Sequence, residues 1–238
     1  TLNYMAQEVS NHQKMKNAFI ASISHELRTP LTSIMGWIIT INTEDIDDKE
    51  ELKEGLDIIE RESKRLASLV EELLDFSKFD AGVITLKKDT VNLEKLLKYI
   101  KRQMEPRAER KGITITIDID EELPWIDADE NRLKQVFINI IDNSFKFTQK
   151  GGYVDIIGRK RGDSVLVRIE DTGCGIPKED ILKVTQRFFK GNNVVSGSGL
   201  GLAICDEIIK LHNGEMNIES TVGKGTAVDI VLPVQLEI

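Results

Sequence analysis

The sequence predicts an α+β protein in two parts, an antiparallel helical hairpin over residues 1–80 and an α/β sandwich domain over residues 81–238. In the first part, apolar residues recur at spacings of three and four, which is the period of a helix. After Gly82 several segments alternate apolar and polar residues, as half-buried strands do. With 238 residues, 40% of them hydrophobic, the chain has enough apolar material for a real core.

One long helix is expected over residues 1 to about 42. Its apolar residues form a seam at spacings of three and four, which is typical of a bundle or coiled-coil face. The seam consists of Ile20, Ile23, Leu27, Leu31, Ile34, Ile38 and Ile41.

The acidic stretch NTEDIDDKE interrupts this pattern and predicts the turn of the hairpin. Within it, Asp47 followed by Glu50 resembles a capping box that opens a second helix, which ends near residues 80–82. The apolar residues of this helix are Ile59, Leu66, Leu69, Leu73 and Phe76. Because two helices bury little apolar surface alone, we expect two chains to form a four-helix bundle.

The second part mixes strands and helices. Strands are predicted at 113–119 (ITITIDI), 165–169 (VLVRI) and 228–232 (VDIVL). Helices are predicted at about 92–110, 129–147 and 199–212, the last closed by His212-Asn213-Gly214. Separate runs of helix and strand indicate helices on one face of a mixed sheet.

The charge balance excludes some classes of protein. The chain has 32 Lys and Arg against 40 Asp and Glu, a formal net charge of -8, with a pI near 5.1. This is the wrong sign for coating nucleic acid or an anionic membrane. Two cysteines make no secreted-type disulfide framework, and no apolar run reaches membrane-spanning length, so we expect a cytoplasmic chain.

His25 lies in the segment SHELRTPL, residues 24–31. A helix turns about 100° per residue, so His25 points away from the apolar seam and toward water. A lone exposed histidine usually only solvates a helix face, but Glu26 can orient the imidazole or take its proton, and Thr29 lies one turn on along the same face. Pro30 removes the helical partner of the Glu26 carbonyl, which predicts a bend here.

The predicted helix at 129–147 has two different sides. Its buried side consists of Leu133, Phe137, Ile140 and Ile141. Its polar stripe consists of Arg132, Gln135, Asn139, Asn143 and Lys146. A merely solvated face would be rich in Lys and Glu, whereas amides and a lysine in line offer an oxygen ligand for Mg²⁺ and a cation for phosphate.

Two glycine-containing loops follow. EDTGCGIP (170–177) ends a strand with Asp171 and two glycines, which suits either a plain turn or a tight turn that carries an acceptor to a ligand's amino edge. GNNVVSGSGLGLAI (191–204) places glycines before an apolar helix, where backbone N–H groups bind anions. Its spacing matches neither the dinucleotide-binding pattern nor a P-loop.

Together these segments resemble the sensor histidine kinases of two-component systems. SHELRTP is similar to their H box, NIIDNSFKFT to the N box, DTGCGIP to G1, RFFKG to the F box and GSGLGLAI to G2. The resemblance covers nearly the whole chain, in the family's order, except residues 1–15. It implies a dimerisation and histidine phosphotransfer domain at 1–80, with an incoming signalling helix at 1–18. Residues 81–238 would be a catalytic ATP-binding domain of the Bergerat type, as in heat-shock, gyrase and mismatch-repair ATPases.

The resemblance also implies residue roles. His25 would be the phosphoacceptor, Glu26 its acid/base partner, and Thr29 would orient a water for dephosphorylation. Asn143 would be a Mg²⁺ ligand, and Asp171 would accept the adenine amino group. Further nucleotide contacts would be Asn139 and Lys146 on the phosphate side, Gly173, Gly175, Lys190, Gly197, Gly199, Leu200 and Gly201 around the pocket and lid, and Thr226 on the adenine side.

The implied cofactors are ATP and Mg²⁺. The implied reaction phosphorylates His25 from ATP and then passes the phosphoryl group to an aspartate in the receiver domain of a response regulator. A homodimer through the bundle is expected, with no nucleic acid partner and no membrane contact within this fragment. The chain starts in a helical pattern without an initiator Met, so we expect a fragment of a longer sensor, which could be membrane-anchored.

The nucleotide motifs depart from the family pattern in places. VTQRFFKGN lacks the acidic residue common before the F-box arginine, Phe147 stands where Tyr or His is frequent, and Ala227 and Val228 follow GKGT where an aromatic is usual. The segment 190–197 is short for an ATP lid, and we expect it to be disordered without nucleotide.

Two other classes of function stay open. The first is a Bergerat-type ATPase that drives a clamp, with His25 incidental, and the second is a dimeric scaffold that binds nucleotide as a signal or not at all. An aspartic protease is excluded, because the single DTG follows Glu170 instead of an apolar residue.

The remaining histidines and the cysteines are expected to be structural. His12 has no carboxylate partner at useful spacing, and His212 lies in a last helical turn, where a cation suits the helix dipole. Cys174 and Cys205 are expected to pack as small apolar residues.

Overall fold

The computed structural model describes residues 2–43, 49–80, 85–187, 189, 191 and 199–234. The chain divides into two compact units, the first containing residues 1–82 and the second most of residues 83–238. No helix in the described part of the chain is both long and apolar enough to cross a membrane.

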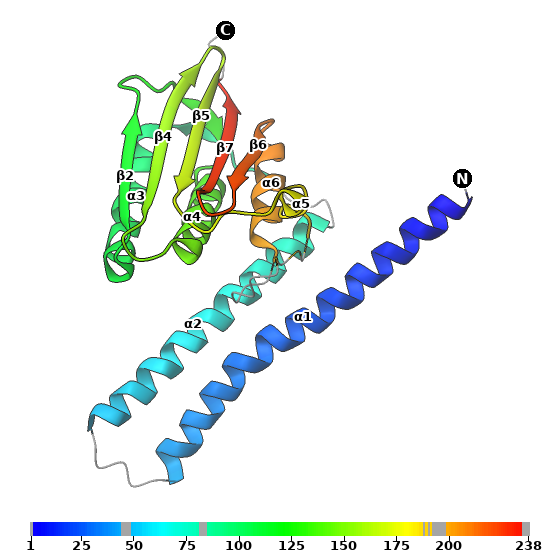
Figure 1. The fold of residues 1–238 in the computed structure, drawn as a ribbon, viewed down its shortest axis with the longest axis vertical. Helices are drawn as coiled ribbons and strands as arrows, with labels where there is room; N and C mark the ends of the chain where they lie inside the picture. Colours follow the sequence, from blue (N-terminus) through cyan, green and yellow to red (C-terminus); the bar gives the residue numbers. More distant parts are fainter. Residues whose placement is uncertain are drawn as a thin grey trace. The chain divides into compact units, whose positions relative to one another are not determined.

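The first unit is a hairpin of two long helices, α1 (Leu2–Thr43) and α2 (Lys49–Asp80) (Figure 1). The single long first helix expected from the apolar spacing is therefore confirmed, and it continues through Pro30 as one helix. The expected capping residue Asp47 lies outside the described residues. Trp37 of α1 packs on Gly55 of α2 so closely that a Cβ at Gly55 would lie 2.6 Å from the ring.

The apolar seam of α1 is split between two surroundings. Four members, Ile23, Leu27, Ile34 and Ile41, are half-buried, whereas the other three are exposed. The large apolar side chains that the described hairpin leaves exposed are Ile20, Leu31, Met35, Ile38, Ile39, Leu56, Val70 and Leu74. One hairpin therefore covers only part of the apolar surface of its helices.

The second unit contains a five-stranded sheet in the order β2-β4-β5-β7-β6. β2 (Thr114–Ile119) runs parallel to β4 (Tyr153–Arg161), and all other pairs are antiparallel. The other strands are β5 (Ser164–Asp171), β6 (Glu215–Thr221) and β7 (Gly225–Pro233). A separate two-stranded sheet pairs β1 (Asp89–Val91) with β3 (Ile126–Ala128).

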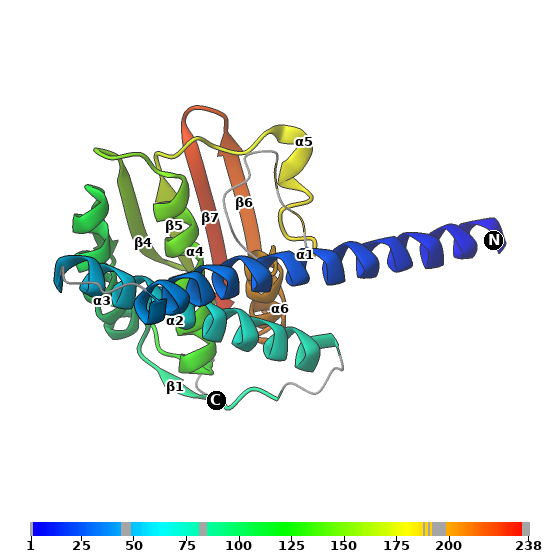
Figure 2. The same ribbon diagram turned by 90° about the horizontal axis from the view of Figure 1, so that it is seen from below.

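Helices α3 (Leu93–Lys111), α4 (Glu130–Phe147) and α6 (Gly201–Leu211) cover one face of the five-stranded sheet (Figure 2). A short helix, α5 (Lys178–Ile181), follows the loop at residues 172–177 that comes after β5. The expected mixed sheet with helices on one face is therefore confirmed. The largest fully buried side chains of this core include Phe137 and Phe145 of α4, Ile156 and Ile169 of the sheet, and Ile208 of α6.

His212 joins the end of α6 to the start of α4. Its Nε2 accepts a hydrogen bond of 2.9 Å from the Asp129 N–H, and its Nδ1 lies 2.8 Å from the Ile208 carbonyl. Both bonds form at once only in the neutral tautomer with the proton on Nδ1. Burial lowers the pKa of His212, whose side chain is 2% exposed. The expectation of a cation at this helix end is therefore wrong, and His212 is a neutral, structural residue.

Candidate functional site

The surroundings of His25 are set by the helical repeat of α1. His25 and Thr29 are exposed, whereas Glu26 is half-buried and Pro30 is buried against the hairpin. The Thr29 hydroxyl donates to the His25 carbonyl over 3.2 Å. Thus the imidazole is open to solvent, as its place outside the apolar seam predicts, and a hydroxyl lies one turn away.

Glu26 faces the second helix. Its Oε2 lies 3.1 Å from Nη2 of Arg65, and the Glu26 side chain is only 13% exposed. Arg65 also lies 3.5 Å from Glu62. The sequence alone does not predict this ion pair, because the two residues are 39 positions apart and only the folded hairpin brings them together.

Asp171 is the centre of the second candidate site, at the carboxyl end of β5. Its Oδ1 accepts hydrogen bonds from the backbone N–H of Gly173 at 2.9 Å and of Thr226 at 3.2 Å. Its Oδ2 accepts one from the Ser144 hydroxyl at 2.9 Å. Burial raises the pKa of Asp171, and these hydrogen bonds act in the opposite direction. The side chain is 8% exposed, so its direction is fixed.

The backbone around Asp171 is too close for side chains. A Cβ at Gly173 would lie 2.8 Å from Asp171 Oδ1 and 2.9 Å from the Phe147 carbonyl. Gly225 has φ of 129°, and a Cβ there would lie 1.8 Å from the Asp171 carbonyl. Gly175 has φ of 72°, and a Cβ there would lie 2.2 Å from the Thr221 carbonyl oxygen. At these three positions the neighbouring backbone leaves no room for a side chain, so only glycine fits.

Asn139, a member of the polar stripe on α4, contacts α6. The Asn139 amide lies between Gly201 and Cys205 of α6, because its Nδ2 is 3.5 Å from the Cys205 sulfur and a Cβ at Gly201 would lie 2.7 Å from the same nitrogen. The Cys205 thiol is fully buried and also contacts the Val136 carbonyl at 3.7 Å. Burial raises its pKa to about 12, so the thiol stays protonated.

Asn143 and Lys146 continue the stripe and are half-buried. Lys146 Nζ lies 5.3 Å from the centre of the Phe147 ring. In the described residues, no three His, Cys, Asp or Glu side chains cluster as a metal site. The residues therefore fit a hard cation such as Mg²⁺ only if amide oxygens of the stripe share it with oxygens of the ligand, which is how Mg²⁺ commonly binds.

The structure brings together part of the predicted nucleotide site. Asp171, Gly173 and Thr226 form one hydrogen-bonded group, and Asn139 and Gly201 form a second close contact. Gly199 and Leu200 lie directly before α6, whereas Lys190, Gly197 and most of the expected lid lie outside the described residues.

Two features of this site were missed or misjudged. Ser144, which donates to Asp171, was not predicted, although a signal exists: it continues the buried side of α4 three residues after Ile141, where a hydroxyl needs a partner. The expected packing of Cys174 is wrong because this cysteine is exposed, whereas Cys205 is buried as expected.

These two sites define a class of protein: an α/β domain with a buried carboxylate in a glycine-containing turn, which follows a helical hairpin with an exposed histidine. Comparison with family models agrees on both parts. Residues 15–82 match the His Kinase A (phospho-acceptor) domain, and residues 128–236 match the histidine kinase-, DNA gyrase B-, and HSP90-like ATPase domain. The chain belongs to the sensor histidine kinases of two-component systems.

Named relatives support this assignment. Sensor histidine kinase YclK of Bacillus subtilis (strain 168) is 36% identical over 237 residues, which is 98% of this chain and 50% of that protein. This chain therefore spans about half the length of that relative.

Solved structures agree as well. The histidine kinase ThkA in complex with the response regulator protein TrrA matches with a TM-score of 0.72 and 27% identity, over 99% of this chain and 67% of that one. Full-length ShkA in complex with AMPPNP matches with a TM-score of 0.71 and 30% identity, over 91% and 46% of the two chains.

Proposed function

We propose that this chain is a histidine kinase core that phosphorylates its own His25 from ATP and passes the phosphoryl group to an aspartate of a response regulator. In this proposal residues 1–80 serve dimerisation and phosphotransfer, and residues 81–238 bind ATP. The observation that carries the proposal is that one chain has both a buried, hydrogen-bonded Asp171 and an exposed His25 that is followed in sequence by Glu26.

Asp171 has room for one more donor. A carboxylate offers about four lone-pair sites, and Gly173, Thr226 and Ser144 use three of them. The remaining site on Oδ2 suits the exocyclic amino group of adenine, and it would discriminate against guanine, which has a carbonyl at that position. The ShkA structure with AMPPNP supports an adenine nucleotide in this fold.

The amide stripe suits the phosphate end. Asn143 would hold Mg²⁺ through its amide oxygen, and Asn139 and Lys146 would lie beside the phosphates. When bound, Mg²⁺ supplies positive charge that offsets the charge of the phosphate oxygens. Gly199, Leu200 and Gly201 at the start of α6 would offer backbone N–H groups to the same oxygens.

His25 is then the nucleophile. A neutral imidazole has one nitrogen with a free lone pair, which can attack the γ-phosphorus as ADP leaves. Glu26 would receive the proton from the other ring nitrogen. The domain that holds ATP must approach α1 for this step.

The response regulator would be the second substrate. The ThkA complex with TrrA supports such a partner. In a separate reaction that releases phosphate, the Thr29 hydroxyl would orient a water for hydrolysis of the regulator's phospho-aspartate, since its oxygen still has lone pairs while it donates to the His25 carbonyl.

We also propose a homodimer. The eight large apolar side chains that the described hairpin leaves exposed suit a second copy of the same hairpin, which would complete a four-helix bundle. The cytoplasmic location expected from the sequence stays a prediction.

The test is incubation with γ-labelled ATP and Mg²⁺, followed by acid and alkali treatment of the protein. A phosphohistidine is labile in acid and stable in alkali, so the label should be lost only in acid. His25→Gln should abolish the label and leave nucleotide binding intact, because His25 is exposed. Release of phosphate without labelled protein would favour an ATPase clamp, and neither label nor release would favour a scaffold.

A further inference from the structure

We propose that Arg65 is a positioning residue for phosphorylation of His25, acting through Glu26. This rests on the proposed function, in which Glu26 takes the imidazole proton. Arg65 would hold the Glu26 carboxylate in its ionised form and fix its place between the two helices of the hairpin.

The helical repeat explains the arrangement. Glu26 and Pro30 are four residues apart on the face of α1 that turns toward α2, whereas His25 is exposed. A carboxylate that is 13% exposed would be costly to ionise without a charged partner. Arg65 supplies that partner from α2, at 3.1 Å.

Arg65 is shared between two carboxylates. One terminal nitrogen, Nη2, bonds Glu26, and the other, Nη1, lies 3.5 Å from Glu62. The planar fork of a guanidinium allows both contacts at once, and a single ammonium group on a flexible chain does so less well. Glu62 also has Arg61 at 3.3 Å, so it has a second cation.

The chemical consequence concerns one proton. As the P–N bond forms on one ring nitrogen of His25 and the bond to ADP breaks, the proton on the other ring nitrogen must leave. Glu26 can accept it only when its carboxylate is ionised. A nearby cation favours the ionised form, so Arg65 keeps the base ready at lower pH.

The test compares Arg65→Gln with Arg65→Lys and with the matched control Arg61→Gln. Arg61 is on the same helix, bears the same charge and contacts Glu62, but its side chain is 68% exposed. Autophosphorylation rates are measured against ATP concentration between about pH 5.5 and pH 8.5, with circular dichroism and sedimentation as checks on folding and dimerisation.

We expect Arg65→Gln to lower kcat by at least about tenfold with little change in KM for ATP, because the nucleotide site is untouched. The acid side of its pH profile should move to higher pH. Arg65→Lys should recover much of the rate and the profile, and Arg61→Gln should behave like the wild type.

Three results would overturn the inference. The first is an equal loss in Arg61→Gln, which would indicate a general charge effect. The second is a pH profile of Arg65→Gln that keeps its wild-type position, and the third is a rise in KM that accounts for the loss of rate. If the wild type itself gains no acid-labile label, the proposed function fails as a whole.

Discussion

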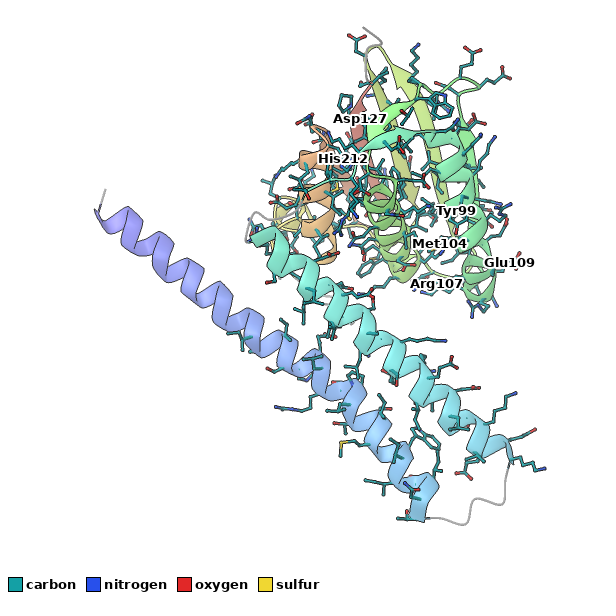
Figure 3. All side chains as sticks on the ribbon, turned by 180° about the vertical axis from the view of Figure 1, so that it is seen from behind. Tyr99, Met104, Arg107, Glu109, Asp127 and His212 are labelled. Carbon is teal, nitrogen blue, oxygen red and sulfur yellow. The ribbon has the colours of Figure 1, made fainter. Side chains whose placement is uncertain are left out.

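Replacing His212 with glutamine should remove a pH-dependent part of the stability of the α/β unit. In the folded chain the neutral ring accepts from Asp129 N–H and contacts the Ile208 carbonyl, with 2% of its side chain exposed. Burial lowers the pKa of His212, and Lys88 acts in the same direction, against the Ile208 carbonyl and the carboxylates of Asp129 and Asp127. Figure 3 shows Asp127 near His212, in agreement with the effect of its carboxylate.

The sign and size follow from proton linkage. The unfolded chain takes up a proton on His212 near its ordinary pKa of 6.5, whereas the folded chain takes it up only at lower pH. The contribution of His212 to the free energy of unfolding is therefore fully present above about pH 6.5 and decreases as the pH falls below this value. If the ring stays neutral in the folded state, the loss between about pH 7.5 and pH 5.5 is at most about 1.4 kcal/mol.

The assay is urea unfolding at these two pH values, followed by tryptophan fluorescence. The chain has two tryptophans, so a Trp37→Phe background leaves Trp125, which precedes β3, as a reporter of the α/β unit. His212→Gln keeps a side-chain acceptor within reach of Asp129 N–H but cannot titrate. Acidic groups with raised pKa values, such as Asp142 and Asp229, contribute to both proteins and cancel in the difference. If the wild type and the variant lose the same stability between the two pH values, the neutral-histidine reasoning is wrong.

Three further predictions concern the sites. Gly225→Ala should abolish nucleotide binding and destabilise the α/β unit, because the alanine Cβ would lie 1.8 Å from the Asp171 carbonyl. Calorimetry with AMPPNP and thermal melting measure the two effects. Gly223→Ala is the control, since Gly223 also has positive φ but a Cβ there would have no atom within 4 Å. Asn143→Ala should remove the gain in nucleotide affinity that Mg²⁺ gives, and equal Mg²⁺ dependence in both proteins would move the cation elsewhere. Thr29→Ala should keep autophosphorylation and lose dephosphorylation of the regulator, with little cost in stability because Thr29 is exposed; a parallel fall of both rates would show a shared role.

The helices and the motif loops were the predictable part of this molecule. The buried side of α4 follows the three-and-four spacing, and Leu133, Phe137, Ile140 and Ile141 are all at most 1% exposed. Such a spacing reports directly on which side a helix packs, so it can be seen without knowing the partner.

Two strands of the five-stranded sheet were not predicted, for different physical reasons. β4 carries Ile156, Ile157 and Gly158 in succession, which hides its alternation. A Cβ at Gly158 would lie 3.0 Å from the Leu123 side chain and 3.2 Å from that of Ile119, so a glycine packs here with the least crowding. β6 lies at the sheet edge and pairs with β7 alone, so its half-exposed side chains need little apolar pattern.

The candidate sites were predictable residue by residue but not contact by contact. Asp171 stood out because a carboxylate and two glycines ended a strand. Its bonds to Ser144 and Thr226, and the pair of Glu26 with Arg65, join residues 27 to 55 positions apart. Only the folded chain brings such residues into contact, and local spacing carries no information about them.

The difference in exposure between the two cysteines makes it possible to measure how often α6 separates from α4. Cys174 is exposed, whereas Cys205 is fully buried beside Asn139 with a thiol pKa of about 12. A thiol reagent should therefore modify Cys174 at once and reach Cys205 only when α6 separates from α4. The slow phase of such labelling would time that separation, and a nucleotide held between these helices should lengthen it.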